Sequence, residues 1–136
     1  MADAKELVRR LTDEVFIGGD TGVIDELVAE DFVDNDPVPG LSPDREGLRQ
    51  LASMVGAFSD RKMSKDTYYQ DGDIVVEDWL MTGRHTGDFL GVPPQGNEVT
   101  MRGIELWRVR DDKIIEHWGV VDMITAFSQM GGFPQL

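Results

Sequence analysis

Asp122 is the first residue of this sequence whose type and position indicate chemistry. It follows an apolar, β-branched run that predicts a buried strand, and it precedes an apolar run with helical spacing. An aspartate at such a corner either caps a helix by accepting backbone N–H bonds or serves as a functional group. On a strand, Trp118, Val120 and Asp122 share one face, so an indole and a carboxylate would line the same wall. We therefore expect Asp122 to lie in a cavity as a general acid or base whose pKa is raised by desolvation.

A base that removes a proton next to a carbonyl needs a hydrogen-bond donor where the enolate oxygen develops. His85 is the candidate donor, because it shares a strand face with Trp79 and Gly83 and the small Gly83 would leave room for a ligand. A buried structural histidine bonded to the following loop is the alternative. His117 has the opposite parity from Asp122, so we expect it on the outer sheet face or at an oligomer interface, unless a bulge reverses its direction.

Aromatic and acidic residues on the predicted strands supply candidate walls for a substrate pocket. Glu105 shares a strand face with Trp107, and an acid there lies either in a pocket, which we favour, or on a solvent-exposed face. Trp79, Trp107 and Trp118 could form a slot for a flat substrate, although at least one of them is expected to be plain core. Phe89, in a loop flanked by glycines, would form a lip at the mouth of the cavity.

The composition excludes several classes of function. Among 136 residues, 13 Lys and Arg stand against 26 Asp and Glu, a net charge of −13 that argues against binding nucleic acid or an anionic membrane. No cysteine and only two histidines leave no disulfides, no thiolate chemistry and no histidine-rich metal cluster, and neither a GxSxG elbow nor a phosphate-binding glycine loop is present. The N-terminus has no apolar signal core, and no stretch approaches the ~20 apolar residues of a membrane span, so we expect a cytoplasmic protein.

The elements that position these residues follow from periodicity and turn residues. Residues 1–136 are expected to form one domain, in which three N-terminal helices are followed by four antiparallel strands and a short last helix. The predicted elements are helices over 3–17, from about 20 to 28 and from 42 to 58, strands over 67–69, 74–85, 99–109 and 114–121, and a helix over 123–130. The acid- and proline-rich stretch from Ala29 to Gly47 is interpreted as a loop, in which Asp34, Asp36 and Asp44 serve as turn or cap residues. This segregation predicts an α+β fold with a cone-shaped cavity between a curved sheet and its helices.

Four motifs, in order along most of the chain, resemble the SnoaL-like polyketide cyclases, also called ester cyclases, of the NTF2-like superfamily. They are FVDNDP at 32–37, GRHTGDFLGVPPQGNEV at 83–99, IELWRVRDDKIIEHW at 104–118 and VVDMITAFSQMG at 120–131. The resemblance implies a cone-shaped α+β barrel, a homodimer or larger homo-oligomer formed through the sheet, and no metal or organic cofactor. It also implies an acid/base aspartate at the position of Asp122, which in such cyclases promotes an intramolecular aldol ring closure.

Asn35 departs from this family pattern, because the family's loop has a histidine there. An amide does not exchange protons at neutral pH, so Asn35 is expected to contact substrate without acid/base work. The substrate implied is a hydrophobic carbonyl compound, aromatic or polycyclic.

Other functions stay open at this point. An isomerase, or an epoxide hydrolase with an Asp-Arg-Asp site, would belong to the same superfamily, but Arg102 and Arg108 have the wrong strand parity beside Glu105. A non-catalytic binding or assembly domain would use the same cavity without chemistry.

Overall fold

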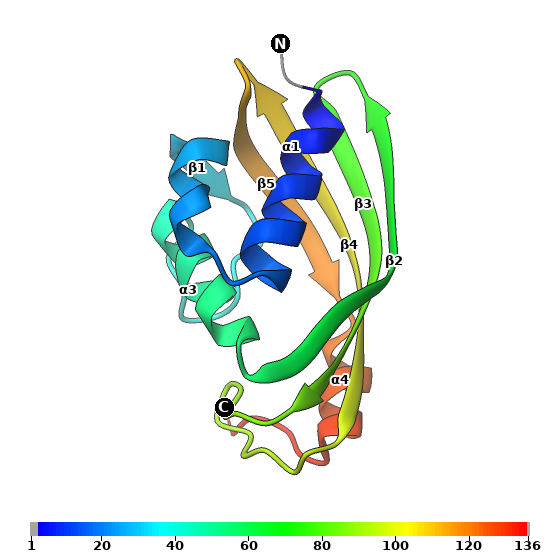
Figure 1. Cartoon of the computed structure of the whole chain (residues 1–136). Helices are drawn as coiled ribbons and strands as arrows, with labels where there is room; N and C mark the ends of the chain where they lie inside the picture. The colour runs from blue at the N-terminus through cyan, green and yellow to red at the C-terminus, as the bar shows by residue number, and fades with distance from the viewer. Residues whose placement is uncertain (1–2, 136) are drawn as a thin grey trace.

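The computed structural model describes residues 3–135 as an α+β fold in which helices cover the concave face of one strongly bent sheet (Figure 1). In chain order the elements are α1 (Ala4–Arg10), η1 (Leu11–Ile17), η2 (Thr21–Val23), α2 (Ile24–Leu27), β1 (Val28–Asp34), α3 (Arg45–Val55), β2 (Phe58–Asp71), β3 (Ile74–His85), β4 (Glu98–Arg110), β5 (Lys113–Val121) and α4 (Met123–Met130). The predicted fold class is confirmed, and the predicted strand number of four is wrong.

The additional strand is β1, which the sequence analysis assigned to a loop. It pairs in parallel with β5 at the end of a sheet whose order is β1-β5-β4-β3-β2, and all other pairs are antiparallel. Only Val28 and Phe32 of this strand are buried, and the charged Glu30 and Asp31 between them are exposed. This spacing breaks the alternation that identifies a strand from sequence.

Two irregularities of β2 and one of β5 bend the sheet. The register of β2 against β3 shifts between Ser59 and Lys62 and again between Met63 and Lys65, which marks two bulges in this long strand. In β5, Ile114 pairs with Val109 while Glu116 pairs with Arg108, so one residue is inserted between them. The inserted residue places Ile114 and His117 on the same face of the sheet, the concave one.

The helices start and stop at capping groups. The Asp44 side chain accepts a bond from the backbone N–H of Gly47 at 3.1 Å, so α3 begins at Arg45, after the predicted start. The predicted helix over 3–17 is α1 continued by the π-helical η1, which ends with the N–H of Gly18 donating to the carbonyl of Asp13 at 2.9 Å. In the view of Figure 1, these helices cover the upper half of the sheet.

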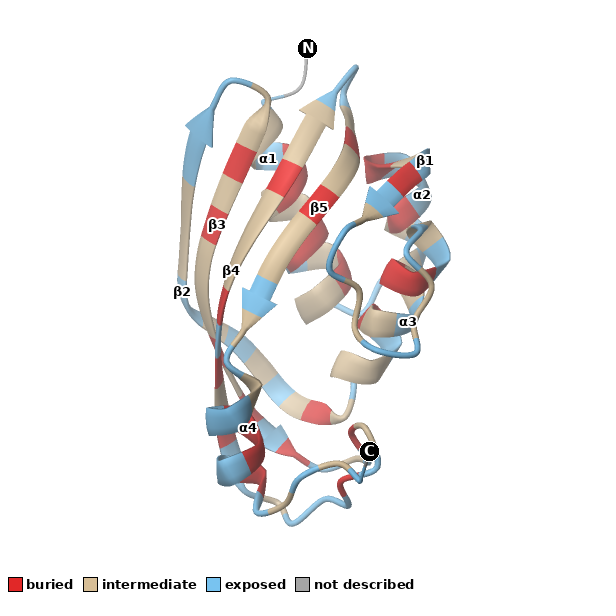
Figure 2. Cartoon of the chain, turned by 180° about the vertical axis from the view of Figure 1, so that it is seen from behind, coloured by how far each residue is buried: buried red, intermediate tan, exposed pale blue. Residues whose placement is uncertain are grey.

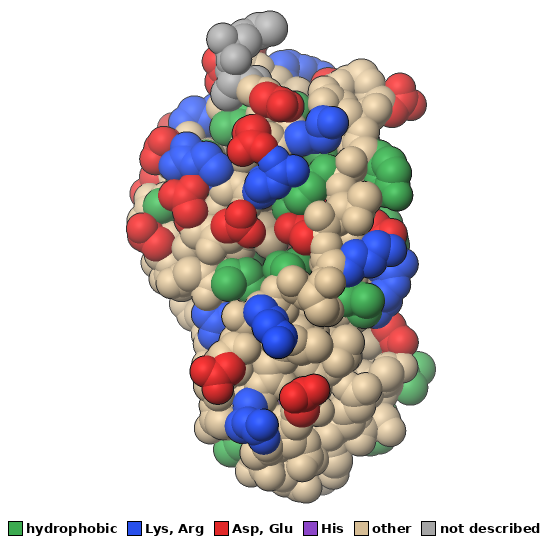
Figure 3. Space-filling model, turned by 45° about the vertical axis from the view of Figure 1, so that its right-hand side comes forward, with side chains coloured by type: hydrophobic (Ala, Val, Ile, Leu, Met, Phe, Trp, Pro, Cys, Tyr) green, Lys and Arg blue, Asp and Glu red, His purple; other side chains and the backbone are tan. Residues whose placement is uncertain are grey.

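The interior contains two apolar clusters with a space between them. One joins α1, η1, α2 and α3 to the sheet around Trp107, and the other joins α4 and the β3–β4 loop around Phe58 and Phe127. Figure 2 shows the buried residues of the strands and helices, while the end of β5 and part of α4 are exposed. Both histidines are buried, and none is visible on the face shown in Figure 3.

Candidate active site

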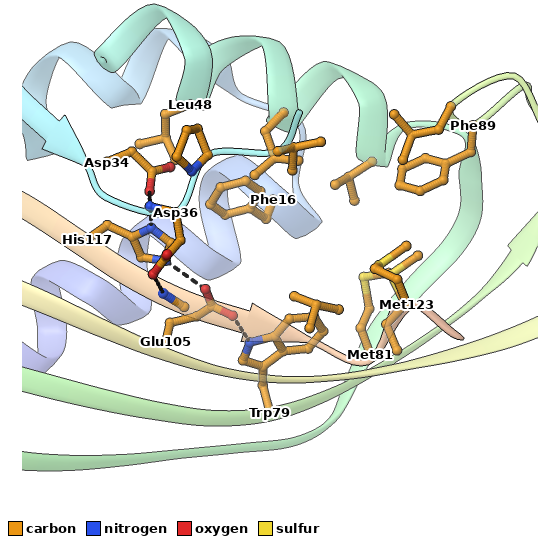
Figure 4. A pocket seen from close by; sticks show the side chains of 18 of the residues that line it. Phe16, Asp34, Asp36, Leu48, Trp79, Met81, Phe89, Glu105, His117 and Met123 are labelled. Carbon is orange, nitrogen blue, oxygen red and sulfur yellow. Dashed lines mark hydrogen bonds and ion pairs between the residues drawn. The ribbon is translucent and has the colours of Figure 1, made fainter. Parts of the chain in front are cut away.

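A cavity of about 570 Å³ lies between the concave face of the sheet and the segments that cover it, namely η1, α3 and the loop after β1. This volume is in the range of pockets that hold drug-sized ligands. Most of its lining side chains are apolar, and Asp34, Asp36 and Glu105 gather at one end around His117 (Figure 4).

His117 is held between two carboxylates. Its Nδ1 lies 2.8 Å from Oδ1 of Asp34, and its Nε2 lies 2.7 Å from Oε1 of Glu105. The side chain packs on Trp107, its cross-strand neighbour, with ring centroids 4.3 Å apart, and the residue is 7% exposed. Burial lowers the pKa of His117, but the bonds to Asp34 and Glu105 outweigh it and raise the pKa to about 9. With an acceptor at each nitrogen, the ring is an imidazolium at neutral pH.

Glu105 is fixed by two donors on opposite sides. Its Oε1 faces His117, and its Oε2 accepts a bond from Nε1 of Trp79 at 2.8 Å. Two glycines leave the space for this arrangement. A Cβ on Gly119 would collide with the Glu105 carboxylate, and a Cβ on Gly103 would collide with the Trp79 indole. The sequence therefore keeps one carboxylate in an apolar cavity with its orientation fixed.

The loop that follows β1 brings two further acids to this end of the cavity. Asp34 ends β1 and bonds His117, while one carboxylate oxygen of Asp36 accepts a bond from the N–H of Gly119 at 3.0 Å. The backbone N–H of Asn35 between them donates to the carbonyl of His117 at 2.9 Å. The parallel pairing of β1 with β5 thus positions the acids on both sides of Asn35.

A fourth carboxyl, Glu77, lies on β3 directly across from Glu105. It lines the cavity, is 2% exposed, and accepts bonds from the Oγ1 of Thr12 at 2.7 Å and the Nε1 of Trp107 at 3.2 Å. Burial, and then the nearby Asp66, raise the pKa of Glu77 to about 8. Glu77 is not among the residues that the sequence predicted for the site.

The opposite end of the cavity is apolar and rich in methionine. Met63, Met81, Met101 and Met123 line it together with Phe127. Unbranched thioether side chains adapt to irregular shapes, so this end can accommodate a hydrophobic skeleton of variable outline.

Asp122 does not lie in the cavity, and the predicted raised pKa is wrong. Its side chain is exposed and caps α4, with Oδ1 accepting from the backbone N–H of Thr125 at 3.1 Å and Oδ2 from the Thr125 hydroxyl at 2.6 Å. These bonds favour the ionised form and lower the pKa of Asp122. The capping interpretation is the one the structure bears out.

His85 lies on the predicted sheet face but outside the cavity. It is fully buried, and its ring stacks on Phe58 at a centroid distance of 5.3 Å, while Phe89 packs against the same phenyl ring. A Cβ on Gly83 would approach Cβ of Phe58 at 3.1 Å, so this glycine makes room for β2 and not for a ligand. The predicted donor role next to a substrate is therefore wrong for His85.

The preferred position of His117 was also wrong, and the reason is the orientation of β5. His117, Gly119 and Val121 line the cavity, so Trp118 and Val120 with the opposite parity face outward. The pairing of β5 with β4 contained a usable signal, because β5 residues directly opposite the cavity-facing residues of β4 must also face the cavity. The structure pairs His117 with Trp107 and Gly119 with Glu105.

The remaining predicted substrate contacts divide into two groups. Trp79, Phe89, Glu105 and Trp107 line the cavity. Trp118 is on the outer face, where the guanidinium of Arg108 lies 5.5 Å from its ring centroid. The Asn35 side chain donates to Glu116 at 3.0 Å and to the His117 carbonyl at 3.1 Å, and Asn35 is not among the described residues that line the cavity. Its role is to fix the loop to β5.

The epoxide hydrolase alternative finds no support in the cavity. Within residues 3–135, no arginine lines it, so the centre of an Asp-Arg-Asp site is missing. The same described residues include no group of three or more acidic or histidine side chains arranged to hold a metal ion.

A bent sheet that encloses a mainly apolar cavity, with carboxyl groups around an imidazole at one end, is typical of proteins that bind small molecules. The chain belongs to the SnoaL-like polyketide cyclase family, whose sequence profile matches residues 6–130. The prediction of a cyclase of this family, an enzyme, is thereby confirmed. The family resemblance also predicted that Asp122 acts in catalysis. The structure does not support this role, because Asp122 caps α4 outside the cavity.

Among curated proteins, the chain is similar to aklanonic acid methyl ester cyclase DauD from Streptomyces sp. strain C5, with 27% identity over 96% of this chain and 83% of that protein. It is also similar to nogalonic acid methyl ester cyclase from Streptomyces nogalater, with 26% identity over 85% of this chain and 89% of that protein. Both relatives are named as cyclases of an acid methyl ester.

Solved structures give the same result for the fold. IdmH from Streptomyces antibioticus, which is assigned as a polyketide cyclase, is 30% identical and superposes with a TM-score of 0.80 over 96% of this chain and 99% of IdmH. A SnoaL-like protein from Jannaschia sp. CCS1 is 25% identical, with a TM-score of 0.82 over 96% of this chain and 93% of that protein. In residues 3–135, no helix is both long and apolar enough to cross a membrane.

Proposed function

We propose that this protein closes a ring in a neutral polyketide ester by an intramolecular aldol reaction, with Glu105 as the base. The observation that carries the proposal is the position of Glu105. It is a carboxylate in an apolar cavity of about 570 Å³, oriented by His117 on one oxygen and Trp79 on the other.

Glu105 would take the proton from a carbon next to a carbonyl group. The carbon then attacks a second carbonyl of the same molecule, one carbon–carbon bond forms, and the second carbonyl oxygen takes up a proton. The positive charge of His117 beside Glu105 stabilises the negative charge that develops on the enolate. Asp34, on the other side of the imidazole, keeps that ring protonated and oriented. The product is an isomer of the substrate.

The shape and charge of the cavity indicate the substrate class. The apolar end can hold a polycyclic skeleton in a conformation that brings the reacting carbons together, which is a large part of the advantage of an intramolecular reaction. Asp34, Asp36 and Glu105 line the cavity together with the carboxyl of Glu77, and the imidazolium of His117 is the one cation among the described lining residues, so negative charge predominates. A free carboxylate would be repelled, and a methyl ester of the kind named for the two curated relatives would be accepted.

The direct test is turnover of aklanonic acid methyl ester and nogalonic acid methyl ester by the purified protein. We expect a product of unchanged mass and altered retention, formed without added metal or nucleotide, and we expect neither free acid to compete. Failure to consume either ester at high protein concentration would refute the proposed function for this substrate class.

A homodimer is part of the proposal. The outer sheet face and the adjoining end of α4 expose apolar side chains, with Val120 72% exposed and Ile124 76% exposed. Contact between two such faces would remove the apolar surface from water. Sedimentation of a monomer at micromolar concentration would contradict this part.

A further inference from the structure

Glu77 is a second carboxyl of the cavity that the proposed reaction does not yet use. It lies on β3 across from Glu105, and side chains of directly opposite residues in an antiparallel pair are ~5 Å apart at Cβ. Each carboxyl accepts a hydrogen bond from an indole on the other strand. Nε1 of Trp79 on β3 donates to Glu105 on β4, and Nε1 of Trp107 on β4 donates to Glu77 on β3. Glu105 has in addition the imidazolium of His117, whereas the side chains that donate to Glu77 are all neutral.

The hydrogen bonds around Glu77 require one more hydrogen than the hydroxyl groups supply. Oε2 of Glu77 lies 2.7 Å from the hydroxyl oxygen of Thr12 and 3.2 Å from that of Tyr68, and the Tyr68 hydroxyl also lies 2.5 Å from Oδ2 of Asp66. These are three contacts between oxygen atoms, and Thr12 and Tyr68 carry one hydroxyl hydrogen each. A proton on the carboxyl of Glu77 completes the set.

The charges that face this carboxyl favour the same state. Asp66 of β2 and Glu105 of β4 are acidic neighbours, and Oδ1 of Asp66 is buried without a hydrogen-bond partner. Asp13 of η1 adds negative charge near Asp66, and its own pKa is raised, first by burial and then by Asp66. Two cations lie on either side of this group: the guanidinium of Arg9 of α1 lies over the ring of Tyr68 at 4.8 Å from its centroid, and the imidazolium of His117 of β5 bonds Glu105. An uncharged carboxyl avoids adding another negative charge to this buried group.

We propose that Glu77 is the general acid of the cavity, a neutral carboxylic acid that gives its proton to the carbonyl oxygen attacked during ring closure. This inference rests on the proposed function. Glu105 takes a proton from carbon, the new carbon–carbon bond forms, and the electron pair of the attacked carbonyl accepts the proton of Glu77. The Tyr68 hydrogen then turns from Asp66 to the ionised Glu77. Transfer of a proton from Glu105 to Glu77 through solvent restores both groups.

This assignment explains why two carboxyls face each other in one cavity. Environments that separate the pKa values of two such groups produce one base and one acid. Glu105 bonds an imidazolium, whereas burial and then Asp66 raise the pKa of Glu77 to about 8, so Glu77 is the protonated member at neutral pH. An acid with a pKa near the working pH is the most effective proton donor.

The test compares Glu77→Gln with the wild type and with Glu98→Gln, a substitution of an exposed glutamate at the start of β4. The amide keeps the size, the neutrality and a hydrogen-bond donor but has no proton to transfer. We expect kcat on aklanonic acid methyl ester to fall ~10²–10⁴-fold in Glu77→Gln with KM within about threefold of the wild type. We also expect the wild-type kcat to decrease as the pH rises through about 8, the pKa of Glu77, and this decrease to be absent from the variant.

Infrared difference spectra of wild type against Glu77→Gln supply a readout that needs no substrate. A carboxylic acid C=O band at pH 7 that disappears in the variant supports the assignment, and a carboxylate band in its place overturns it. A Glu77→Gln enzyme with wild-type kcat and pH profile would refute the acid role alone. A wild-type protein that fails to cyclise the ester would refute the proposed function and this role together.

Discussion

Asp122 and Glu105 are both carboxylates of the β4–β5 half of the sheet, and they lie in opposite environments. Asp122 is exposed, accepts two hydrogen bonds from Thr125 and has a lowered pKa. Glu105 points into the cavity between the imidazolium of His117 and the indole of Trp79. The comparison shows that an acid between apolar sequence runs need not be desolvated. What decides its chemistry is the face of the strand and the partners that reach it.

The largest effect in this comparison is expected from removing Asp34, which supports the Glu105 site from the other side of the imidazole. Asp34→Ala leaves the buried imidazolium with one carboxylate, and breaking a buried ion pair by removing one partner costs ~3–5 kcal/mol. We expect urea unfolding to show a loss toward the lower end of that range and turnover to fall. Asp31→Ala, in an exposed part of β1, is the matched control. A stability equal to that of the control would show that Asp34 does not hold His117.

A smaller effect is expected from pH, and it has a definite sign. The pKa of His117 is about 9 in the folded protein against an ordinary value of 6.5, so its contribution to stability is complete below pH 6.5 and is lost as the pH rises through 9. The shift corresponds to at most about 3 kcal/mol.

Wild type and His117→Gln should therefore be compared by urea unfolding between pH 6 and 9.5. We expect the difference in unfolding free energy between them to shrink as the pH rises. A difference that stays constant across this range would mean that His117 is not an imidazolium in the folded protein. The contribution of Glu77 to stability is lost over a lower pH range, between its ordinary pKa of 4.5 and its pKa of about 8 in the folded protein. This loss is the same in both proteins and cancels in the difference.

The smallest effect is expected at Asp122. Asp122→Ala removes an exposed helix cap and leaves the cavity intact, so the loss of stability is expected to be small. Thermal unfolding should shift down by a few degrees. Asp122→Asn should be close to the wild type, because asparagine is an equally good cap. An Asp122→Ala protein as stable as the wild type would mean that the cap contributes nothing.

The sequence predicted the regular parts of the fold well. The long run from Ile74 to His85 corresponds to β3, and the predicted strands over 99–109 and 114–121 correspond to β4 and β5, which a turn at Asp111 and Asp112, both with positive φ, connects. Strand β1 was not predictable from periodicity, because its exposed charged residues interrupt the apolar alternation and its only pairing is a parallel one at the sheet edge.

The site was only partly predictable, and the reason is physical. Alternation along a strand shows which residues share a face, but it does not show which face points inward. For β5 that choice depends on its register against β4, where Gly119 makes room for Glu105. The cap and acid/base interpretations of Asp122 share the same local pattern, so only tertiary structure separates them. Glu77 acquires its environment from Thr12 and Trp107, which are remote in sequence, and from Tyr68 across the β2–β3 hairpin.

The most direct test of the account is a parallel measurement of kcat for Glu105→Gln and Asp122→Asn on aklanonic acid methyl ester, with circular dichroism to verify that both are folded. Glutamine keeps the shape of Glu105 but cannot act as a base, so we expect Glu105→Gln to lose ~10²–10⁴-fold in kcat and Asp122→Asn to retain the wild-type value within about twofold. The opposite result, an active Glu105→Gln and an inactive Asp122→Asn, would contradict the assignment of the base and favour the exposed aspartate.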